Sequence, residues 1–320
     1  MKSDLSTPLG ALQSPLKVKA NAMWKKLNDS KLLLTMLIPA ILYFAIFHYK
    51  PMYGVLIAFK DFKAFKGFDA SPWVGLKHFR MFFSTPNAWR LVRNTFLLAA
   101  NNIIWGFPAP IIFALILNEV KNTHAKKWVQ TISYMPHFIS TVVIVAMIDL
   151  FLSPRNGMIN NMLVSLGFER IHFMAEAGWF RTVYVVSEIW QGLGWGAIIY
   201  LAALTNIDPQ LYEAAMVDGA TKIKQIIYIT LPCLAPTITT LFLLRMGRVM
   251  SVGFEKVFLM QTPVIYETAD VIQTFVYRQG MIQGNMSFAT AIGLFNSVIN
   301  IFFLIASNAI ARKLNETSLW

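Results

Sequence analysis

The stretch Asn206-Ile-Asp-Pro-Gln-Leu-Tyr-Glu-Ala-Ala-Met-Val-Asp-Gly-Ala-Thr-Lys-Ile-Lys-Gln-Ile-Ile-Tyr-Ile-Thr-Leu-Pro232 lies between two long apolar segments and encodes a local structure of its own. Asp208 can cap a first helix whose first residue is proline. Gly219 can end that helix in a left-handed turn, and Thr221 can cap a second helix. Pro232 is expected to separate the second helix from the following apolar segment. Two capped helices with no core of their own must dock on another surface, so we predict a helix–turn–helix contact element.

The composition of the whole chain is that of a membrane protein. Of its 320 residues 56% are hydrophobic and 14% are charged, against roughly 25% charged in a typical soluble protein. So much apolar surface must face lipid, which predicts an all-α, polytopic membrane protein. Lys and Arg exceed Asp and Glu by 28 to 16, and we expect this excess in loops near anionic headgroups rather than at nucleic acid. The single cysteine, Cys233, excludes an internal disulfide and a multi-cysteine metal site.

Six stretches are long and apolar enough, or nearly so, to cross a bilayer core, which takes about 20 residues. They are residues 32–49, 94–117, 131–152, 182–204, 233–252 and 287–311. Lysines before the first stretch place the N-terminus in the cytoplasm, whereas basic residues summed over all loops do not decide the orientation. We expect a cytoplasmic segment 1–31, a transmembrane domain 32–311 that includes the loop 206–232 on its cytoplasmic side, and a cytoplasmic tail 312–320.

A signature within the loop resembles a known family. Glu213-Ala-Ala is followed after three residues by Gly219 and after nine more by Ile229-Thr-Leu-Pro232, which is similar to the EAA signature of ABC importer permeases at every fixed position. The resemblance implies that the first helix inserts into a groove on a nucleotide-hydrolysing subunit in the cytoplasm. The coupling residues it implies are Glu213, Ala214, Ala215, Asp218, Gly219 and Ala220.

Other segments narrow the resemblance to one class of importer. Tyr49-Lys-Pro-Met-Tyr-Gly54 and Trp73-Val-Gly-Leu76 resemble permeases of the maltose-transporter-like carbohydrate importers. The run from Gly253 to Arg278 is similar to the branch that handles oligosaccharides released from polysaccharides. The resemblance implies a non-catalytic subunit in a bacterial cytoplasmic (inner) membrane. The implied partners are two ATPase subunits, a second and different permease, an extracytoplasmic solute-binding protein, the oligosaccharide and membrane lipids.

Motifs of competing functions are absent from the sequence. Without a GxxxxGK[ST] loop the chain is expected to hold no cofactor, and ATP and Mg²⁺ are expected on the partner ATPases. Gly192-Leu-Gly-Trp-Gly196 lies in an apolar stretch and favours close helix packing over nucleotide binding. A membrane-embedded glycosyltransferase, the less favoured alternative, predicts an Asp-x-Asp metal pair that the sequence lacks. A self-sufficient channel or secondary transporter leaves the EAA loop unexplained.

Polar residues inside the apolar stretches are costly and usually face a bundle interior or a water-filled path. Sugars can bind amides through hydroxyl groups and aromatic side chains through apolar ring faces. The candidates for a substrate path are Glu188, Trp190, Gln191, Trp195, Arg245, Arg248, Asn296 and Asn300, with Asn101 and Asn102 as further polar positions. For each residue singly, an interhelical hydrogen bond or an interfacial tryptophan is the alternative.

Arg245 and Arg248 are the most costly of these, because one arginine at a helix centre costs about 3 kcal/mol. In a continuous helix they would share one face and need a polar group opposite. That group could be Asp149, Glu188 or Glu255, a residue of the partner permease, or an anionic substrate. We therefore favour an oligosaccharide that contains uronic acid, with a neutral oligosaccharide as the alternative.

Overall fold

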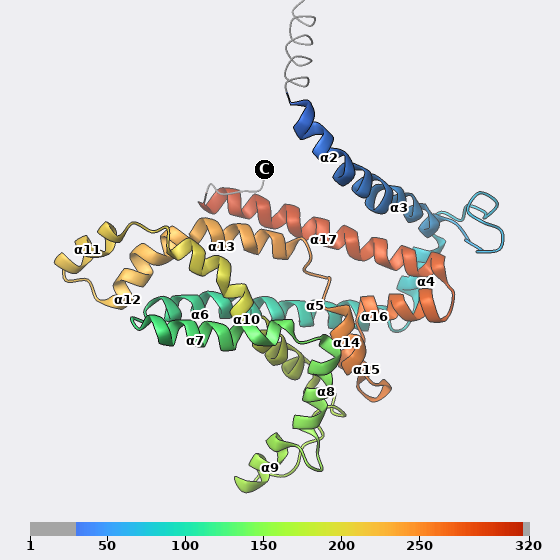
Figure 1. Ribbon diagram of the computed structural model, residues 1–320. Helices are drawn as coiled ribbons and strands as arrows, with labels where there is room; N and C mark the ends of the chain where they lie inside the picture. Colours follow the sequence, from blue (N-terminus) through green and yellow to red (C-terminus); the bar gives the residue numbers. More distant parts are fainter. Residues whose placement is uncertain (1–29, 316–320) are drawn as a thin grey trace, which may run out of the picture. The chain divides into compact units, whose positions relative to one another are not determined.

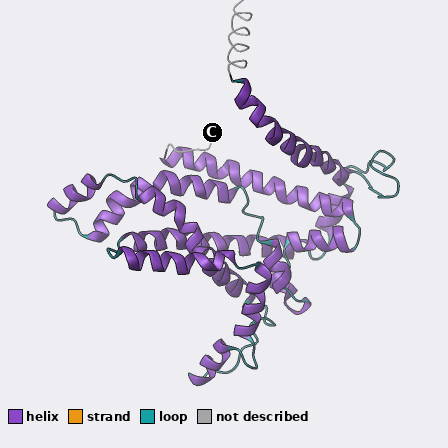
Figure 2. Ribbon diagram, viewed as in Figure 1, coloured by secondary structure: helices purple, strands orange, loops and turns teal. Residues whose placement is uncertain are grey.

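The computed structural model describes residues 30–315 and shows a protein built from helices (Figures 1 and 2). Within these residues the only β-type pairing is an isolated antiparallel bridge between Lys60 and Trp73. The all-α prediction is therefore confirmed for the described part of the chain. The chain divides into two compact units, and the boundary in the sequence falls between Leu56 and Ile57. Expectations for residues 1–29 and 316–320 lie outside the described residues.

The first unit contains α2 (Lys31–Phe44), a π-helical turn (Ala45–Tyr49) and α3 (Lys50–Met52). Large apolar side chains of α2, such as Leu37 and Ile41, are exposed. A helix that is apolar around its circumference needs lipid or another protein against it.

The second unit holds the remaining helices. Its α-helices are α4 (Lys77–Ser84), α5 (Ala88–Asn101), α6 (Pro108–Asn118), α7 (Thr123–Tyr134), α8 (Thr141–Leu152), α9 (Met158–Ser165), α10 (Phe180–Leu204), α11 (Pro209–Val217), α12 (Lys222–Gln225), α13 (Leu231–Met246), α14 (Phe254–Met260), α15 (Tyr266–Ala269), α16 (Ile272–Tyr277) and α17 (Met286–Asn315). π-helical turns occupy Asn102–Gly106, Ile226–Thr230 and Arg278–Ile282, and 3-10 turns occupy Met135–Phe138 and Pro263–Ile265. A further 3-10 segment, Tyr53–Phe59, contains the boundary between the two units.

Between residues 30 and 315, four helices are long and apolar enough to cross a membrane: Leu34–Phe59, Ala88–Asn118, Lys222–Met246 and Met286–Lys313. A fifth candidate is the pair Thr123–Phe138 and Thr141–Leu152, which is bent by 102° at its break. α10 has 25 residues, but glycines and polar residues lower its hydropathy and it is not among these helices. The described chain is thus a helical membrane protein with four such helices, or five if the bent pair is one span.

The third predicted span, 131–152, is not a straight helix. α7 passes into the 3-10 turn that contains Pro136, and the backbone becomes extended at Ile139. Ser140 then caps α8 by accepting a hydrogen bond from the backbone N–H of Val143 over 3.5 Å. A proline and a new N-cap reset the chain direction within a few residues, which apolar composition alone does not reveal.

The fifth predicted span, 233–252, has different limits in the structure. Helical structure runs from Lys222 to Met246 without a break, so the expected separation at Pro232 is wrong. The π-helical turn before Pro232 widens the backbone, and the proline then falls in the first turn of α13. Because α13 ends at Met246, Arg248 lies in the following turn, and the helix face expected to carry both arginines does not form.

Glycines let α10 pack closely on two neighbouring helices. A Cβ on Gly194 would overlap the backbone of Ser133 in α7, and a Cβ on Gly196 would lie 3.0 Å from Pro110 Cγ in α6. No described atom lies within 4 Å of the corresponding position on Gly192. Close packing is therefore confirmed for two of the three glycines.

The segment between α13 and α17 is anchored on α5. Asn94 Nδ2 donates hydrogen bonds to the backbone carbonyls of Glu267 and Asp270 over 2.8 and 3.1 Å. Thr95 Oγ1 accepts one from the backbone N–H of Ile272 over 2.9 Å. Buried polar groups that are paired in this way fix α15 and α16 against the long helices.

We expect Gly194→Ala to lower the thermal unfolding midpoint of the purified protein in detergent, because overpacking a tight contact costs about 1–3 kcal/mol. Gly192→Ala is the matched control on the same helix. It adds the same methyl group in open space, and alanine is the better helix former. Equal midpoints for the two variants would show that the contact of α10 with α7 does not limit stability.

Candidate functional site

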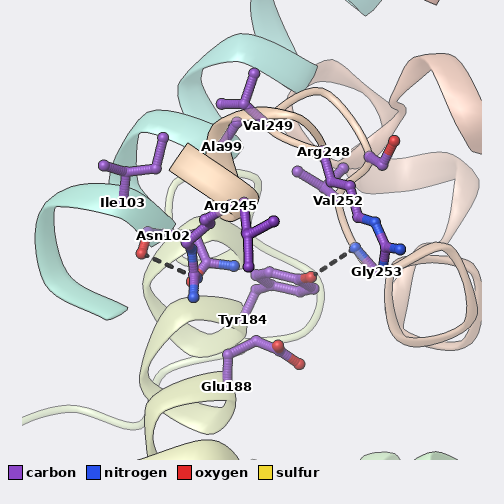
Figure 3. Close-up of a pocket in the computed structure, with 12 residues that line it drawn as sticks. Ala99, Asn102, Ile103, Tyr184, Glu188, Arg245, Arg248, Val249, Val252 and Gly253 are labelled. Carbon is purple, nitrogen blue, oxygen red and sulfur yellow. Dashed lines mark hydrogen bonds between the residues drawn. The ribbon is translucent and has the colours of Figure 1, made fainter. Parts of the chain in front are cut away.

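A cavity of about 520 Å³ lies among the long helices of the second unit (Figure 3). It is lined by the end of α5 with its π-helical turn, the N-terminal part of α10, and the end of α13 with the turn that follows. The lining residues are Ala99, Asn102, Ile103, Tyr184, Glu188, Leu244, Arg245, Arg248, Val249, Ser251, Val252 and Gly253. The structure thus brings Glu188, Arg245 and Arg248 together with Asn102, as members of the predicted path.

Arg245 is held by an amide and not by a carboxylate. Its Nη2 donates a hydrogen bond to Asn102 Oδ1 over 2.7 Å and approaches the backbone carbonyl of Asn102 at 3.4 Å (Figure 3). Asn102 begins a π-helical turn, a feature that often occurs at functional sites. Because an amide oxygen carries no net charge, this contact orients the guanidinium without neutralising it.

Arg248 also lines the cavity, from the turn after α13. Its side chain is exposed, and its guanidinium forms no hydrogen bond or ion pair with any residue between 30 and 315. The cavity therefore contains one guanidinium oriented by an amide and one with no partner among the described residues, and no carboxylate neutralises either of them.

Glu188 is the only carboxylate among the described residues that line the cavity. It accepts a hydrogen bond from Lys256 Nζ over 2.8 Å and forms its ion pair there, not with either arginine. Of the acidic residues expected opposite the arginines, Asp149 lines a separate cavity and Glu255 is exposed on α14. Of the three, only Glu188 lines the cavity of the arginines, and its ion pair is with Lys256.

Lys256 is a site residue that the sequence analysis missed. Its side chain is 3% exposed, and besides Glu188 its Nζ donates to Gln191 Oε1 over 3.3 Å. The one signal in the sequence is a lysine inside the short, mostly apolar run Phe254–Met260. That run lies outside the six predicted membrane spans, so the high cost of a charge inside a span did not single out Lys256.

α10 presents one face to this lysine. Tyr184, Glu188 and Gln191 follow at helical spacing, so their side chains lie on the same side of the helix. The hydroxyl of Tyr184, which is fully buried, accepts a hydrogen bond from the backbone N–H of Gly253 over 3.1 Å (Figure 3). This bond ties the turn before α14 to α10.

Asn296 and Asn300 on α17 do not line the cavity but support its wall. Asn300 Oδ1 accepts from the backbone N–H of Met250 over 2.8 Å, and its Nδ2 donates to Ser251 Oγ over 3.2 Å. Asn296 Nδ2 donates to the backbone carbonyl of Met250 over 3.4 Å. Both side chains are buried, and they position the turn that carries Arg248.

The remaining predicted residues lie away from the cavity. Trp190 lines two smaller apolar cavities. Trp195 stacks on His137 with ring centroids 4.5 Å apart and planes 3° apart. Gln191 donates to the backbone carbonyl of Ile139 over 3.3 Å, and Asn101 bonds within its own helix. The structure does not bring these four side chains into the arginine-lined cavity.

The caps and the turn predicted in residues 206–232 form, but the second helix runs on into α13 instead of ending at Pro232. Asp208 accepts the capping bond from the backbone N–H of Gln210 over 2.9 Å, and Thr221 accepts one from Lys224 over 3.4 Å. Gly219 has a φ of +73°, the left-handed conformation that favours glycine. Tyr212 and Thr230, whose hydroxyl oxygens are 3.0 Å apart, tie α11 to the π-helical turn after α12.

The outer surface of this element is apolar and uncovered. Val217 is 88% exposed, and Leu211, Met216 and Ile223 are exposed beside it. Glu213, Ala214, Asp218 and Gly219 are exposed as well, whereas Ala215 and Ala220 are partly covered. Such a surface on a projecting pair of helices is suited to docking on another protein.

A bundle of apolar helices, a polar cavity at its interior and a projecting pair of capped helices define the membrane subunit of a transporter. Residues 106–316 match the family described as "Binding-protein-dependent transport system inner membrane component". The chain belongs to this family, which confirms the resemblance and identifies it as a permease subunit that leaves ATP hydrolysis to a separate subunit.

Several relatives resemble the chain along nearly all of its length. Protein LplB of Bacillus subtilis is 44% identical, with 92% of each chain covered. The polygalacturonan/rhamnogalacturonan transport system permease protein YteP of Bacillus subtilis is 41% identical, with 95% of each chain covered. A chain from the crystal structure of a bacterial ABC transporter involved in the import of the acidic polysaccharide alginate is 42% identical. It superposes with a TM-score of 0.85 over 92% of this chain and 99% of the other.

We expect Asn300→Ala to destabilise the protein more than Asn296→Ala. Loss of Asn300 leaves the buried N–H of Met250 without an acceptor, which costs about 1–3 kcal/mol, whereas Asn296 makes a longer bond and its Oδ1 has no described partner. Thermal unfolding of the two purified variants gives the comparison. A larger loss for Asn296→Ala would contradict the assignment of Asn300 as the main support of this turn.

Proposed function

We propose that this chain is the permease subunit of an ATP-driven, binding-protein-dependent importer of acidic oligosaccharides, such as fragments of a polysaccharide that contains uronic acid. One observation carries the proposal. Arg245 and Arg248 line the same cavity, and the one carboxylate in its described lining is already paired with Lys256. The cavity therefore keeps an excess of positive charge.

The physical chemistry favours an anionic sugar over a neutral one. Charges in a cavity that is partly screened from water interact more strongly than in bulk water, and guanidinium groups bind carboxylates through charge-assisted hydrogen bonds. The relatives support the same substrate class, since one is a polygalacturonan/rhamnogalacturonan permease and a solved structure belongs to an alginate importer. A neutral oligosaccharide would leave both guanidinium groups without a counter-charge.

The membrane topology we propose has six spans with both termini in the cytoplasm, and residues 32–311 form the permease domain. The four apolar helices, the bent pair α7–α8 and α10 supply the six spans. Pairing and packing of its polar residues support α10 as a span despite its lower hydropathy. This arrangement places α11 and α12 on the cytoplasmic side of a bacterial inner membrane.

The partners follow from the same proposal. Two ATPase subunits, which hold ATP and Mg²⁺, receive the exposed apolar surface of α11, with Glu213, Ala214, Ala215, Asp218, Gly219 and Ala220 in or beside the contact. A second, different permease and lipid cover the exposed apolar helices, including α2. A solute-binding protein delivers the sugar, as in the solved alginate transporter, which is in complex with a pentasaccharide-bound periplasmic protein.

The substrate class can be tested by comparing an oligosaccharide of uronic acids with its carboxyl-reduced form in proteoliposomes that contain the complete importer. We expect Arg245→Gln and Arg248→Gln to lower the ratio of acidic to reduced uptake by about tenfold, the effect of about 1.4 kcal/mol. Arg80→Gln, at an exposed arginine of α4 outside the cavity, is the control and should keep the wild-type ratio. Equal losses for both sugars would contradict recognition of the carboxylate.

Coupling can be tested at the turn between α11 and α12. Gly219→Val puts a β-branched side chain at a positive φ, which costs about 1–3 kcal/mol and distorts the docking surface. We expect an assembled complex whose ATPase no longer responds to the sugar-loaded binding protein. Gly219→Asn is the matched control, because asparagine tolerates the left-handed conformation, and should keep the response.

Undiminished ATPase stimulation in Gly219→Val would show that this turn is not the coupling element.

The orientation in the membrane can be tested by cysteine labelling in a Cys233→Ser background. A membrane-impermeant maleimide applied to intact cells should label Glu169→Cys and not Lys224→Cys. Both positions are exposed in the structure. Labelling of Lys224→Cys from outside would reverse the proposed orientation.

A further inference from the structure

We propose that Lys256 sets the charge selectivity of the cavity by holding Glu188 away from the two arginines. The inference rests on the proposed function and deepens it, because it assigns selectivity to a residue outside the cavity lining. Lys256 acts here as a positioning residue: it touches Glu188 and Gln191, and it is not among the residues that line the cavity.

The geometry around Lys256 is that of a fixed counter-ion. Its side chain is almost fully buried, its Nζ lies 2.8 Å from Glu188 Oε1 and 3.3 Å from Gln191 Oε1, and the ring of Tyr184 lies 5.9 Å away. A buried ammonium needs such partners, since leaving a buried charge unpaired is strongly destabilising. The bond from Gly253 to Tyr184 fixes the chain just before α14 and so fixes the place of Lys256.

A second cation lines the same cavity as Glu188. Glu188 and Arg245 line the same cavity and attract each other electrostatically, yet in the structure the ion pair of Glu188 is with Lys256. In Figure 3 the carboxylate of Glu188 lies below the ring of Tyr184, whereas Arg245 reaches towards Asn102. The competition between Lys256 and Arg245 for this carboxylate therefore decides how many positive charges the cavity offers to a ligand.

Removal of the charge of Lys256 changes the number of positive charges that the cavity offers to a ligand. With Lys256 present, Glu188 is neutralised and both guanidinium groups are available. With Lys256→Gln, Glu188 keeps its charge and turns to Arg245, so that only Arg248 remains for a sugar carboxylate. A neutral sugar would be affected much less, because it gains no charge-assisted bond from either arginine.

The test uses the complete importer in proteoliposomes, with the uronic-acid oligosaccharide and its carboxyl-reduced form as probes. We expect Lys256→Gln to lower the ratio of acidic to reduced uptake by about tenfold, which corresponds to about 1.4 kcal/mol. Glu188→Gln should keep this ratio within about twofold of the wild type, because Lys256 already neutralises Glu188. Glu188→Gln with Lys256→Gln should restore the ratio lost in Lys256→Gln. Lys256→Arg should keep the wild-type ratio, because it keeps the counter-charge.

The double variant also covers the case in which Lys256→Gln alone does not assemble. Once Glu188 is neutral, adding Lys256→Gln leaves no lone carboxylate, and the ratio should change by less than about twofold, or roughly 0.4 kcal/mol. A large drop of the ratio in that background, or an equal loss of both sugars in Lys256→Gln, would overturn the inference. Failure of the proposed function looks different: the wild-type importer would itself fail to distinguish the two probes.

Discussion

The structure depends on one constraint, which is that a guanidinium inside an apolar helix bundle must be solvated by the protein or by a ligand. Arg245 meets this constraint through the amide of Asn102 at 2.7 Å. Glu188, the carboxylate that could have neutralised it, is bound instead to Lys256, a lysine brought in by α14. Because the one carboxylate in the described cavity lining pairs with that lysine, the positive charge of the two arginines is not neutralised and can bind a substrate. The turn that carries Arg248 is positioned by Asn300 of α17 and, at its end, by Tyr184 of α10.

The sequence was sufficient to predict the elements that depend on contacts between neighbouring residues. Asp208 and Thr221 cap their helices, and Gly219 makes its left-handed turn, because each of these features depends on a few neighbouring residues. The same holds for the packing of α10 at Gly194 and Gly196, which needs only small side chains on one helix face. The caps and the left-handed turn are local, and the glycine positions on α10 indicate a close contact without showing which helices make it.

The features that depend on distant parts of the chain could not be predicted in this way. Hydropathy does not show that α7 and α8 are bent by 102°, because the bend comes from Pro136 and the N-cap at Ser140. It also does not show that α13 ends at Met246, which moves Arg248 off the helix. Lys256 was missed for a related reason: it meets Glu188 across 68 positions of sequence, and no alternation or spacing links the two.

The central claim is that the cavity itself prefers a negatively charged sugar, independently of the binding protein that delivers it. The most direct measurement is the affinity of the purified complex of this permease with its partner subunits, without binding protein, for a uronic-acid oligosaccharide and for its carboxyl-reduced form. We expect the charged form to bind about tenfold more tightly, a difference of about 1.4 kcal/mol, and the preference to shrink as salt is added. Equal affinities at low salt would contradict the account.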